Sequence, residues 1–217
     1  LAADLAGHPG SGAILVGPRQ EPAVHALAAV LNQVLGATGS TVSYAAEPDP
    51  DRPSHMEAIS GLAEAMASGS VQTLLILGGN PAYDAPADLA FDELLTKVPV
   101  SVHLSLYDDE TSRRCTWHLP QAHGLESWGD GRAFDGTVTM RQPLIQPLYD
   151  GRSAVEVLAM AAGRETASGH DLVREASRTS TTAADFEDSW KRALHDGVVE
   201  ETAWPLVTPR LDPGRLA

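Results

Sequence analysis

The segment VQTLLILGGNP, at residues 71–81, joins a short apolar run to two glycines, an asparagine and a proline. The run has the length and composition of a buried strand, and the glycines and Pro81 end it. In open α/β sheets, ligands bind beyond the carboxyl ends of the strands. Because glycine lets a backbone approach a ligand closely, residues 78–81 form a candidate ligand-binding turn. A plain strand-to-loop turn is the alternative interpretation.

Short apolar runs and amphipathic helical patterns alternate on both sides of this segment. Strands are expected at residues 13–17, 41–44, 71–77, 100–106 and 116–119. Helices are expected at residues 22–35, 54–68 and 88–97, the second with Ser54 and Glu57 as a capping box. Strand–helix–strand alternation favours parallel strands with right-handed crossovers. The sequence therefore predicts an α/β fold: a Rossmann-like, open, mainly parallel sheet with helices on both faces.

The pattern changes after Pro120. Residues 121–136 are rich in glycine, aspartate and histidine and show no periodicity, which predicts a long functional loop. A possible strand at 137–140 and a helix at 153–162 follow, the helix capped by Ser153 with Glu156. We expect a polar, mobile segment at 166–182, an amphipathic helix at 185–195 that uses Phe186, Trp190 and Leu194, and an extended tail. The predicted organisation is a Rossmann-like domain over 1–163 and a polar linker, helix and tail over 164–217.

Composition narrows the classes of function. The chain has 217 residues, 15 Lys plus Arg and 29 Asp plus Glu, so its formal charge is −14. Such an acidic surface disfavours nucleic acid and anionic lipid as partners. No apolar run reaches the ~20 residues of a membrane helix, so we expect a soluble segment without membrane insertion. Because residue 1 is Leu, we expect the chain to be a piece of a longer polypeptide.

The chain has a single cysteine, Cys115. One thiol cannot form an internal disulfide, a four-cysteine zinc site or an iron–sulfur cluster. Arg113 and Arg114 precede it and could lower its pKa, but a buried structural thiol is the favoured interpretation. No pair of a nucleophile and a base stands out, so no catalytic residue is predicted.

A second candidate turn, Tyr107-Asp108-Asp109-Glu110-Thr111, follows the strand at 100–106. Carboxyl ends of parallel strands share one sheet edge, so this acidic turn should lie beside the glycine turn. Its carboxylates could accept hydrogen bonds from a sugar hydroxyl or a base N–H. The alternative is that Asp108 or Asp109 caps a helix, which is the more common use of such residues.

The long loop contains His118, His123 and Glu126, which raise the question of a metal site. The two histidines are five residues apart, a spacing that fits neither a helix face nor strand alternation, and no metal site is predicted. Trp128 and Phe134 are expected to anchor the loop by packing.

In this order the motifs resemble one family. The run LLILGGNPAYDAP, followed by VSVHLSLYDDETSRRCTWHLPQAHGLESWGDGRAFDGTVTMRQPLIQPLYDGRSAVEVL, is similar to the molybdopterin oxidoreductases of the dimethyl sulfoxide reductase type. Within that family it looks like the large iron–sulfur/molybdopterin-like subunit of alternative complex III. The later DFEDSWKRALHDGVVEETAW is similar to the same subunit.

The resemblance implies that the chain is the third, Rossmann-like domain of such a subunit, which holds one nucleotide half of a molybdopterin guanine dinucleotide cofactor. The cofactor-binding residues that the motifs imply are Gly78, Gly79, Asn80, Pro81, Asp108, Glu110, Thr111 and Glu126. One departure concerns CTWHLP, where most of the family reads closer to ADVVLP. The complex III branch shares it, and in that branch the pterin fold is thought to persist without molybdenum.

The function that the resemblance implies is that of a scaffold or cofactor cradle, not catalytic alone, in a quinol-oxidising, electron-transfer respiratory complex. Partners would be the other domains of its own subunit, which hold the iron–sulfur clusters, and further subunits of a membrane complex on the periplasmic or outer face. No cofactor is expected on the fragment itself. Two alternatives stay open: the guanine-dinucleotide-binding domain of an active molybdenum oxidoreductase, and a free-standing nucleotide-binding module.

Overall fold

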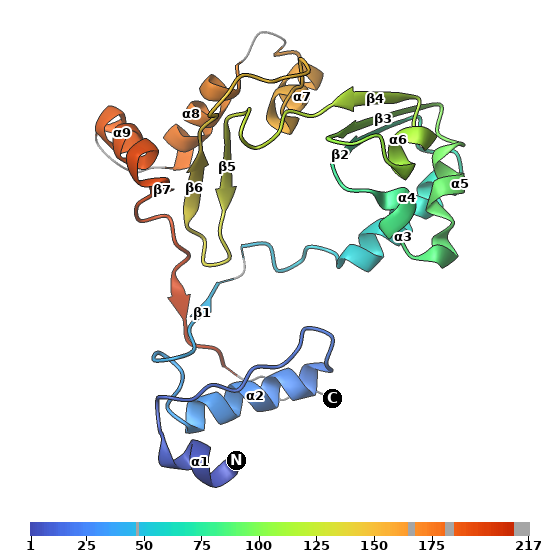
Figure 1. The fold of residues 1–217 in the computed structure, drawn as a ribbon. Coiled ribbons are helices and arrows are strands. Elements are labelled where there is room, and N and C mark those ends of the chain that lie inside the picture. Colours follow the sequence, from blue (N-terminus) through green and yellow to red (C-terminus); the bar gives the residue numbers. More distant parts are fainter. Residues whose placement is uncertain (47, 165–167, 181–184, 211–217) are drawn as a thin grey trace. The chain divides into compact units, whose positions relative to one another are not determined.

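A computed structural model describes residues 1–46, 48–164, 168–180 and 185–210 (Figure 1). The chain forms two compact units. The first comprises Leu1–Pro50 and the segment that starts at Trp204, and the second comprises Asp51–Ala203. The sequence-based boundary after residue 163 falls within the second of these units.

The first unit contains helices α1 (Ala2–Gly7) and α2 (Pro22–Val34). Strand β1 (Tyr44–Ala45) pairs antiparallel with β8 (Leu206–Val207). The helix expected at 22–35 is confirmed. Pro22 occupies its first turn, where a missing N–H costs nothing. The strand expected at 41–44 is reduced to the two residues of β1.

The strand expected at residues 13–17 is wrong. The backbone N–H of Ile14 donates to Asn32 Oδ1 at 2.8 Å, and the Asn32 amide donates back to the Ile14 carbonyl at 2.8 Å. A buried side chain of α2 thus takes the backbone groups that a neighbouring strand would use. The apolar content of residues 13–17 could not show whether their backbone would bond to a neighbouring strand or to a side chain of α2.

The second unit is built on a parallel sheet in the order β2 (Thr73–Leu77), β3 (Val100–Ser105) and β4 (Trp117–Pro120). Leu74 pairs with Ser101, and His103 pairs with His118. The three strands and their parallel direction agree with the sequence analysis, and the α/β class is confirmed.

Short helices connect these strands (Figure 1). The connecting helices are α4 (Pro81–Asp84), a 3₁₀ turn (Ala87–Leu89), α5 (Phe91–Leu95) and α6 (Glu110–Arg114), and the longer α3 (His55–Ala67) precedes β2. The Ser54–Glu57 capping box on α3 is confirmed in both directions. The helix expected at 88–97 is shorter, because Ala90 adopts φ 46° and separates the 3₁₀ turn from α5.

The main apolar cluster of this sheet lies on one face. Met66 of α3 and Leu95 of α5 pack in a cluster that includes Leu74 and Ile76 of β2. The opposite face presents Val100 and Trp117, and Trp117 is 62% exposed. Leu104 lies on this same opposite face and is fully buried, so part of that face is covered as well. Each connection from β2 to β4 returns over the same face (Figure 1).

The rest of the second unit is an antiparallel sheet with three helices. Its elements are β5 (Gly129–Arg132), β6 (Val138–Arg141), β7 (Val198–Val199), α7 (Ala154–Ala161), α8 (Gly169–Ser180) and α9 (Phe186–Asp196). The helices expected at 153–162 and 185–195 are confirmed, and Ser153 forms the expected capping box with Glu156. Trp190 of α9 is buried.

The long loop expected at 121–136 contains a strand. Residues 129–132 lie in the predicted loop but form β5, a strand whose Gly-Asp-Gly-Arg sequence lacks every usual strand former. A Cβ on Gly129 would lie 2.5 Å from Nη2 of Arg141, so the end of that arginine side chain would have to shift to admit a larger residue.

Most of the polar segment expected at 166–182 forms α8, while residues 166–167 and 181–182 of that segment lie outside the described residues. Ser168 accepts the Asp171 N–H at the start of this helix, and Val173 is buried.

Aromatic side chains connect β5 to α8 and α9. The Trp128 and Trp190 rings stack with centroids 6.3 Å apart, and His170 meets Trp128 edge-on at 4.9 Å. Trp128 therefore anchors the loop as expected. Phe134 does not, because it lies fully exposed at the tip of the β5–β6 hairpin. In the described part of the chain, no helix combines the length and apolar character required to cross a membrane.

Candidate functional site

The glycine turn follows β2 directly. Gly78 and Gly79 both have φ 71°, a left-handed conformation that glycine adopts at no steric cost. The Gly78 N–H donates to the Leu104 carbonyl at 2.8 Å, which fixes the turn to β3. Within the described chain, the N–H groups of Gly79 and Asn80 have no hydrogen-bond acceptor. A Cβ on Gly79 would meet nothing within 4 Å, so ligand atoms can approach this backbone.

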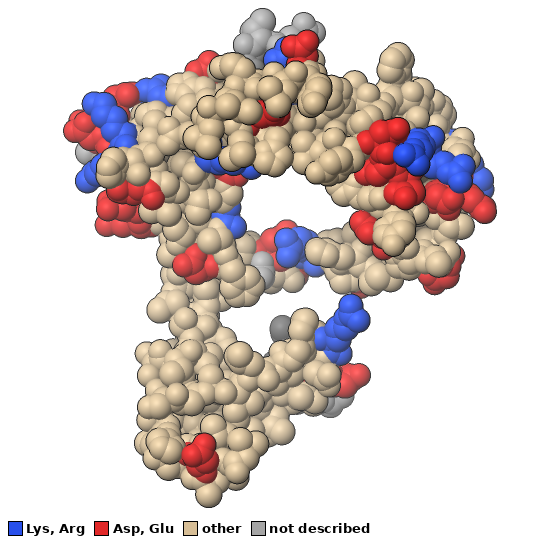
Figure 2. Space-filling model, viewed as in Figure 1, with Lys and Arg blue, Asp and Glu red and all other residues tan. Residues whose placement is uncertain are grey.

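The acidic turn follows β3 and leads into α6. Asp109 caps α6, because its Oδ1 accepts the Ser112 N–H at 2.9 Å. The helix-capping interpretation is thus confirmed for Asp109. Asp108 is exposed and its Oδ1 lies 3.7 Å from Nε of Arg113. Acidic and basic side chains lie together over α5 and α6 (Figure 2).

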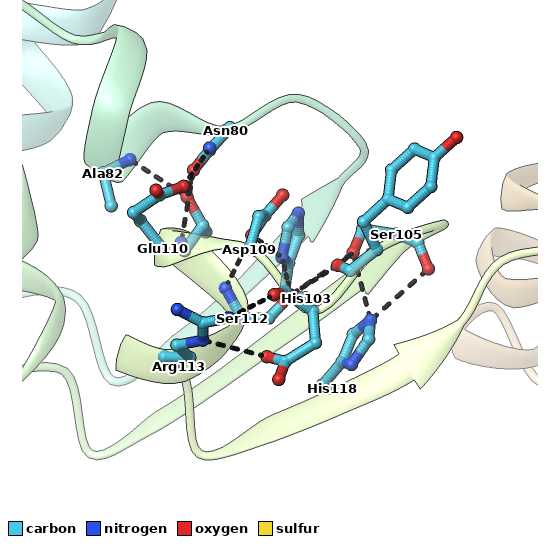
Figure 3. A network of polar contacts seen from close by, with 12 residues as sticks. Asn80, Ala82, His103, Ser105, Asp109, Glu110, Ser112, Arg113 and His118 are labelled. Atoms are coloured by element: carbon cyan, nitrogen blue, oxygen red, sulfur yellow. Dashed lines mark hydrogen bonds and ion pairs between the residues drawn. The ribbon is translucent and has the colours of Figure 1, made fainter.

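The two turns meet at one edge of the sheet, as the sequence predicts (Figure 3). Asn80 Nδ2 donates to Glu110 Oε2 at 2.7 Å, and Asn80 Oδ1 accepts the Thr111 hydroxyl at 2.7 Å and its N–H at 3.2 Å. The Thr111 hydroxyl in turn accepts the Ala82 N–H at 3.0 Å. We call Gly78–Asn80 together with Asp108–Thr111 the rim.

The rim residues differ in what they can offer a ligand. Thr111 is 0% exposed, so it positions Asn80 and cannot itself reach a ligand. Glu110 is exposed, and the hydrogen bond from Asn80 lowers the pKa of its carboxyl. Pro81 starts α4 and has no N–H to give. Ligand contacts would therefore come from the backbone of Gly79 and Asn80 and from the carboxylates.

A buried histidine beneath the rim was missed by the sequence analysis. His103, on β3, is 0% exposed. Its Nε2 lies 3.1 Å from the Gly79 carbonyl oxygen and its Nδ1 2.9 Å from Ser112 Oγ. The side chain thus contacts both turns (Figure 3). Strand alternation places His103 on the same face as Ile76, but nothing local to the sequence shows its two partners.

Glu126 lies away from the rim contacts. Its carboxylate accepts the N–H of His123 at 2.8 Å and that of Leu148 at 3.2 Å, which holds the loop. It also lines a separate cavity of about 550 Å³ with Trp128, Arg152 and other residues. The structure therefore joins Asn80, Glu110 and Thr111 but leaves Glu126 among different neighbours.

The remaining candidate groups make structural contacts. The described residues contain no cluster of three or more His, Cys, Asp or Glu side chains placed to hold a metal. His118 Nε2 lies 3.0 Å from Ser105 Oγ, and His123 Nδ1 accepts the Leu125 N–H. Burial raises the pKa of the Cys115 thiol, opposite to the lowering that Arg113 and Arg114 could have caused.

An open parallel sheet with a glycine turn and an acidic turn at its carboxyl edge defines a Rossmann-like α/β unit. The curated proteins include one relative, the menaquinone reductase molybdopterin-binding-like subunit of Nitratidesulfovibrio vulgaris (strain Hildenborough). It is 29% identical over 137 residues, which cover 58% of this chain and 20% of the relative. The resemblance to the molybdopterin oxidoreductase family is thereby confirmed, and the matched part spans about a fifth of that relative.

Two other comparisons complete the findings. No protein-family model matches the chain. Among solved structures, acetylene hydratase from Pelobacter acetylenicus aligns with 48% of this chain and 15% of its own, at a TM-score of 0.41 and 20% identity.

The rim fits a dinucleotide cofactor in part. The free N–H groups of Gly79 and Asn80 and the open space at Gly79 suit close approach of a phosphate. Asp108 and Glu110 suit ribose hydroxyls or base N–H donors. The negative charges of Asp108 and Glu110 repel a diphosphate. Arg113 does little to offset them, because it already lies against Asp108. The backbone is thus compatible with the cofactor, while the side-chain charge weakens its binding.

Proposed function

We propose that this chain is a scaffold and cofactor cradle within a molybdopterin-oxidoreductase-like subunit of a membrane respiratory complex. The observation that supports it most directly is the rim: Asn80 joins the glycine turn to the acidic turn through Thr111 and Glu110. The relative is named for reducing menaquinone, so its name supports the quinone-linked setting but not the direction of quinol oxidation that we propose. The parent would oxidise quinol and pass electrons through iron–sulfur clusters held by its other domains.

The chain's own contribution is geometric. Asn80 uses both ends of its amide within the rim, so the rim keeps its shape without a ligand. In the alternative, an active molybdenum oxidoreductase, a bound molybdopterin guanine dinucleotide would supply the redox centre. Gly79 and Asn80 would then hold its nucleotide half through their backbone. The parent's partners would be further subunits on the periplasmic or outer face of the membrane.

The full 217-residue chain provides a direct test. Titration calorimetry with GDP should show no micromolar affinity, because the rim carries the acidic residues Asp108, Asp109 and Glu110, and Glu110 lies directly against Asn80. Micromolar binding would instead favour the guanine-dinucleotide site of an active molybdenum oxidoreductase, or a free-standing nucleotide-binding module. Metal analysis of the intact parent separates those two, since molybdenum belongs to the first.

A further inference from the structure

The second unit contains a cavity of about 550 Å³ whose lining includes no residue of the rim. Residues 143–152, in the connection between β6 and α7, supply much of this lining (Figure 1). The volume falls within the range of about 300–1,000 Å³ that ligand-binding clefts have. The apolar part of the lining comprises Trp128, Pro143, Ile145 and Pro147.

Contacts within the chain hold the walls of this cavity. The Arg152 N–H donates to the Pro120 carbonyl at 3.2 Å, and the Arg152 carbonyl accepts the Ala122 N–H at 3.0 Å. Gly151 lies so close to Ala122 that a Cβ on the glycine would be 2.9 Å from the Ala122 nitrogen. Trp128 is held by its aromatic contacts with α8 and α9. The cavity is therefore shaped by the chain's own residues.

Large apolar side chains lie exposed beside the cavity. Leu125, Leu144 and Leu148 are each at least half exposed. They are neighbours, because the Leu144 N–H donates to the Leu125 carbonyl at 2.7 Å and the Leu148 N–H donates to Glu126 Oε1 at 3.2 Å. Neighbouring exposed apolar side chains are typical of protein contact surfaces, and a small molecule inside the cavity would leave them in water. They favour a polypeptide as the occupant.

The charges of the lining favour a basic polypeptide. The charged side chains are three carboxylates and one guanidinium, those of Glu126, Asp150, Glu156 and Arg152. His170 also lines the cavity, and its Nδ1 lies 2.9 Å from Asp171 Oδ1, so that carboxylate offsets any proton on the ring. The whole chain has a formal charge of −14. A positively charged side chain complements this surface.

Two of the three carboxylates have an oxygen available to a partner. Both oxygens of Glu126 accept backbone N–H groups. Glu156 uses Oε2 to accept from Ser153, and within the described chain its Oε1 has no hydrogen bond. The Asp150 carboxylate makes no hydrogen bond or ion pair with a described residue. Asp150 and Glu156 are therefore the acceptors that a cationic side chain would meet.

We propose that this cavity is the docking site of a basic, apolar segment of a partner polypeptide. An arginine or lysine side chain of the segment enters the cavity, where Trp128 packs on its aliphatic stem and Asp150 and Glu156 pair with its charge. Apolar side chains on either side of it cover the three exposed leucines. Because the site uses no rim residue, the proposal does not depend on the proposed function.

Short peptides are the probe. The full chain, labelled with ¹⁵N, is titrated with an end-blocked tripeptide of leucine, arginine and leucine, and the Trp128 indole N–H and Gly169 amide signals are followed by NMR. Both residues line the cavity. The dissociation constant should be about 1 mM. A peptide with glutamate in place of arginine should bind at least about tenfold more weakly, since the carboxylates repel it. A peptide with glycine in place of both leucines should also bind more weakly.

Neutral variants test the two carboxylates. The double variant Asp150→Asn/Glu156→Gln should weaken binding of the arginine peptide about tenfold. Asparagine tolerates the left-handed backbone of residue 150, which has φ 52°, and glutamine keeps the capping box of α7. The matched control is Glu64→Gln/Glu93→Gln, which removes two exposed charges outside the lining and should leave binding unchanged.

If the double variant does not fold, the salt dependence of the wild type decides. Raising the ionic strength from about 0.01 M to about 1 M should weaken binding of the arginine peptide at least about tenfold, because exposed charges are screened. An affinity that does not change with salt, or that the double variant retains, overturns the pairing with the carboxylates and with it the proposal.

The peptides distinguish the other occupants. Equal affinity for the arginine and glutamate peptides overturns the basic segment, and equal affinity for the glycine-flanked peptide identifies a small cation as the occupant instead. If dilution of the chain alone shifts the Trp128 and Gly169 signals, a second copy of the chain occupies the cavity. If no peptide shifts either signal, the cavity is not a docking site.

Discussion

Replacing Asn80 with alanine should destabilise the second unit markedly. The change removes the acceptor of two hydrogen bonds from Thr111, at 2.7 Å and 3.2 Å, and Thr111 is completely buried. Leaving a buried donor unpaired costs about 1–3 kcal/mol, so we expect a loss of about 2–4 kcal/mol in the free energy of unfolding. The bond to the exposed Glu110 is left out of this sum.

Urea denaturation followed by circular dichroism measures the loss, with amide hydrogen exchange of β3 as a local probe. Thr111→Val removes the hydroxyl that donates to Asn80 and keeps the backbone N–H, so the double variant should lose less than the two single variants together. Glu110→Gln is the control and should change stability little. A loss below about 0.5 kcal/mol for Asn80→Ala, typical of a surface substitution, would refute this reasoning. So would strict additivity in the double variant.

Three further outcomes follow from single contacts. Asn80→Ala should raise the pKa of Glu110 toward its ordinary value, since Asn80 is the main cause of its lowering. In the wild type, the Glu110 carboxylate stabilises the fold at pH values above its unfolded pKa, and this contribution is lost as the pH falls through its folded pKa. NMR titration of the Glu110 carboxyl carbon measures the pKa, and equal values in the wild type and in Asn80→Ala would contradict the prediction. Ser153→Ala should cost about 1 kcal/mol in urea denaturation because α7 loses its cap, whereas Ser153→Asp should stay near wild type. Gly79→Ala should destabilise the protein by about 1 kcal/mol, because residue 79 has a left-handed backbone conformation. Gly61→Ala in α3, where a Cβ would meet nothing within 4 Å, should stabilise it by about 0.5–1 kcal/mol. If thermal melts show that both variants shift the melting temperature in the same direction, the backbone argument is wrong.

The sequence was informative wherever the signal was local. The apolar run before Gly78 and the pairs Ser54–Glu57 and Ser153–Glu156 predicted elements that the structure contains. Such signals work because capping residues and strand-ending glycines act on their own neighbours in the chain. The meeting of the two turns also followed, since parallel strands end at one edge.

Long-range partners could not be predicted. Nothing near Ile14 shows that Asn32 takes its backbone groups, so an apolar run suggested a strand. His103 reads as an ordinary strand residue, although it contacts both turns of the rim. Glu126 follows the family motif in sequence, yet its carboxylate holds the backbone of its own loop. In each case the deciding contact spans residues that only the fold brings together.

The central claim is that the rim acts as a scaffold in the intact parent and does not hold a stoichiometric molybdenum cofactor. The parent complex can be purified, its molybdenum measured by mass spectrometry, its nucleotides released by acid, and its quinol oxidation assayed in the same preparation. A scaffold and cradle without its own chemistry predicts quinol oxidation with substoichiometric molybdenum and no matching release of guanosine monophosphate. Molybdenum and guanosine monophosphate in equimolar amounts with the subunit would contradict it and would identify an active molybdenum enzyme.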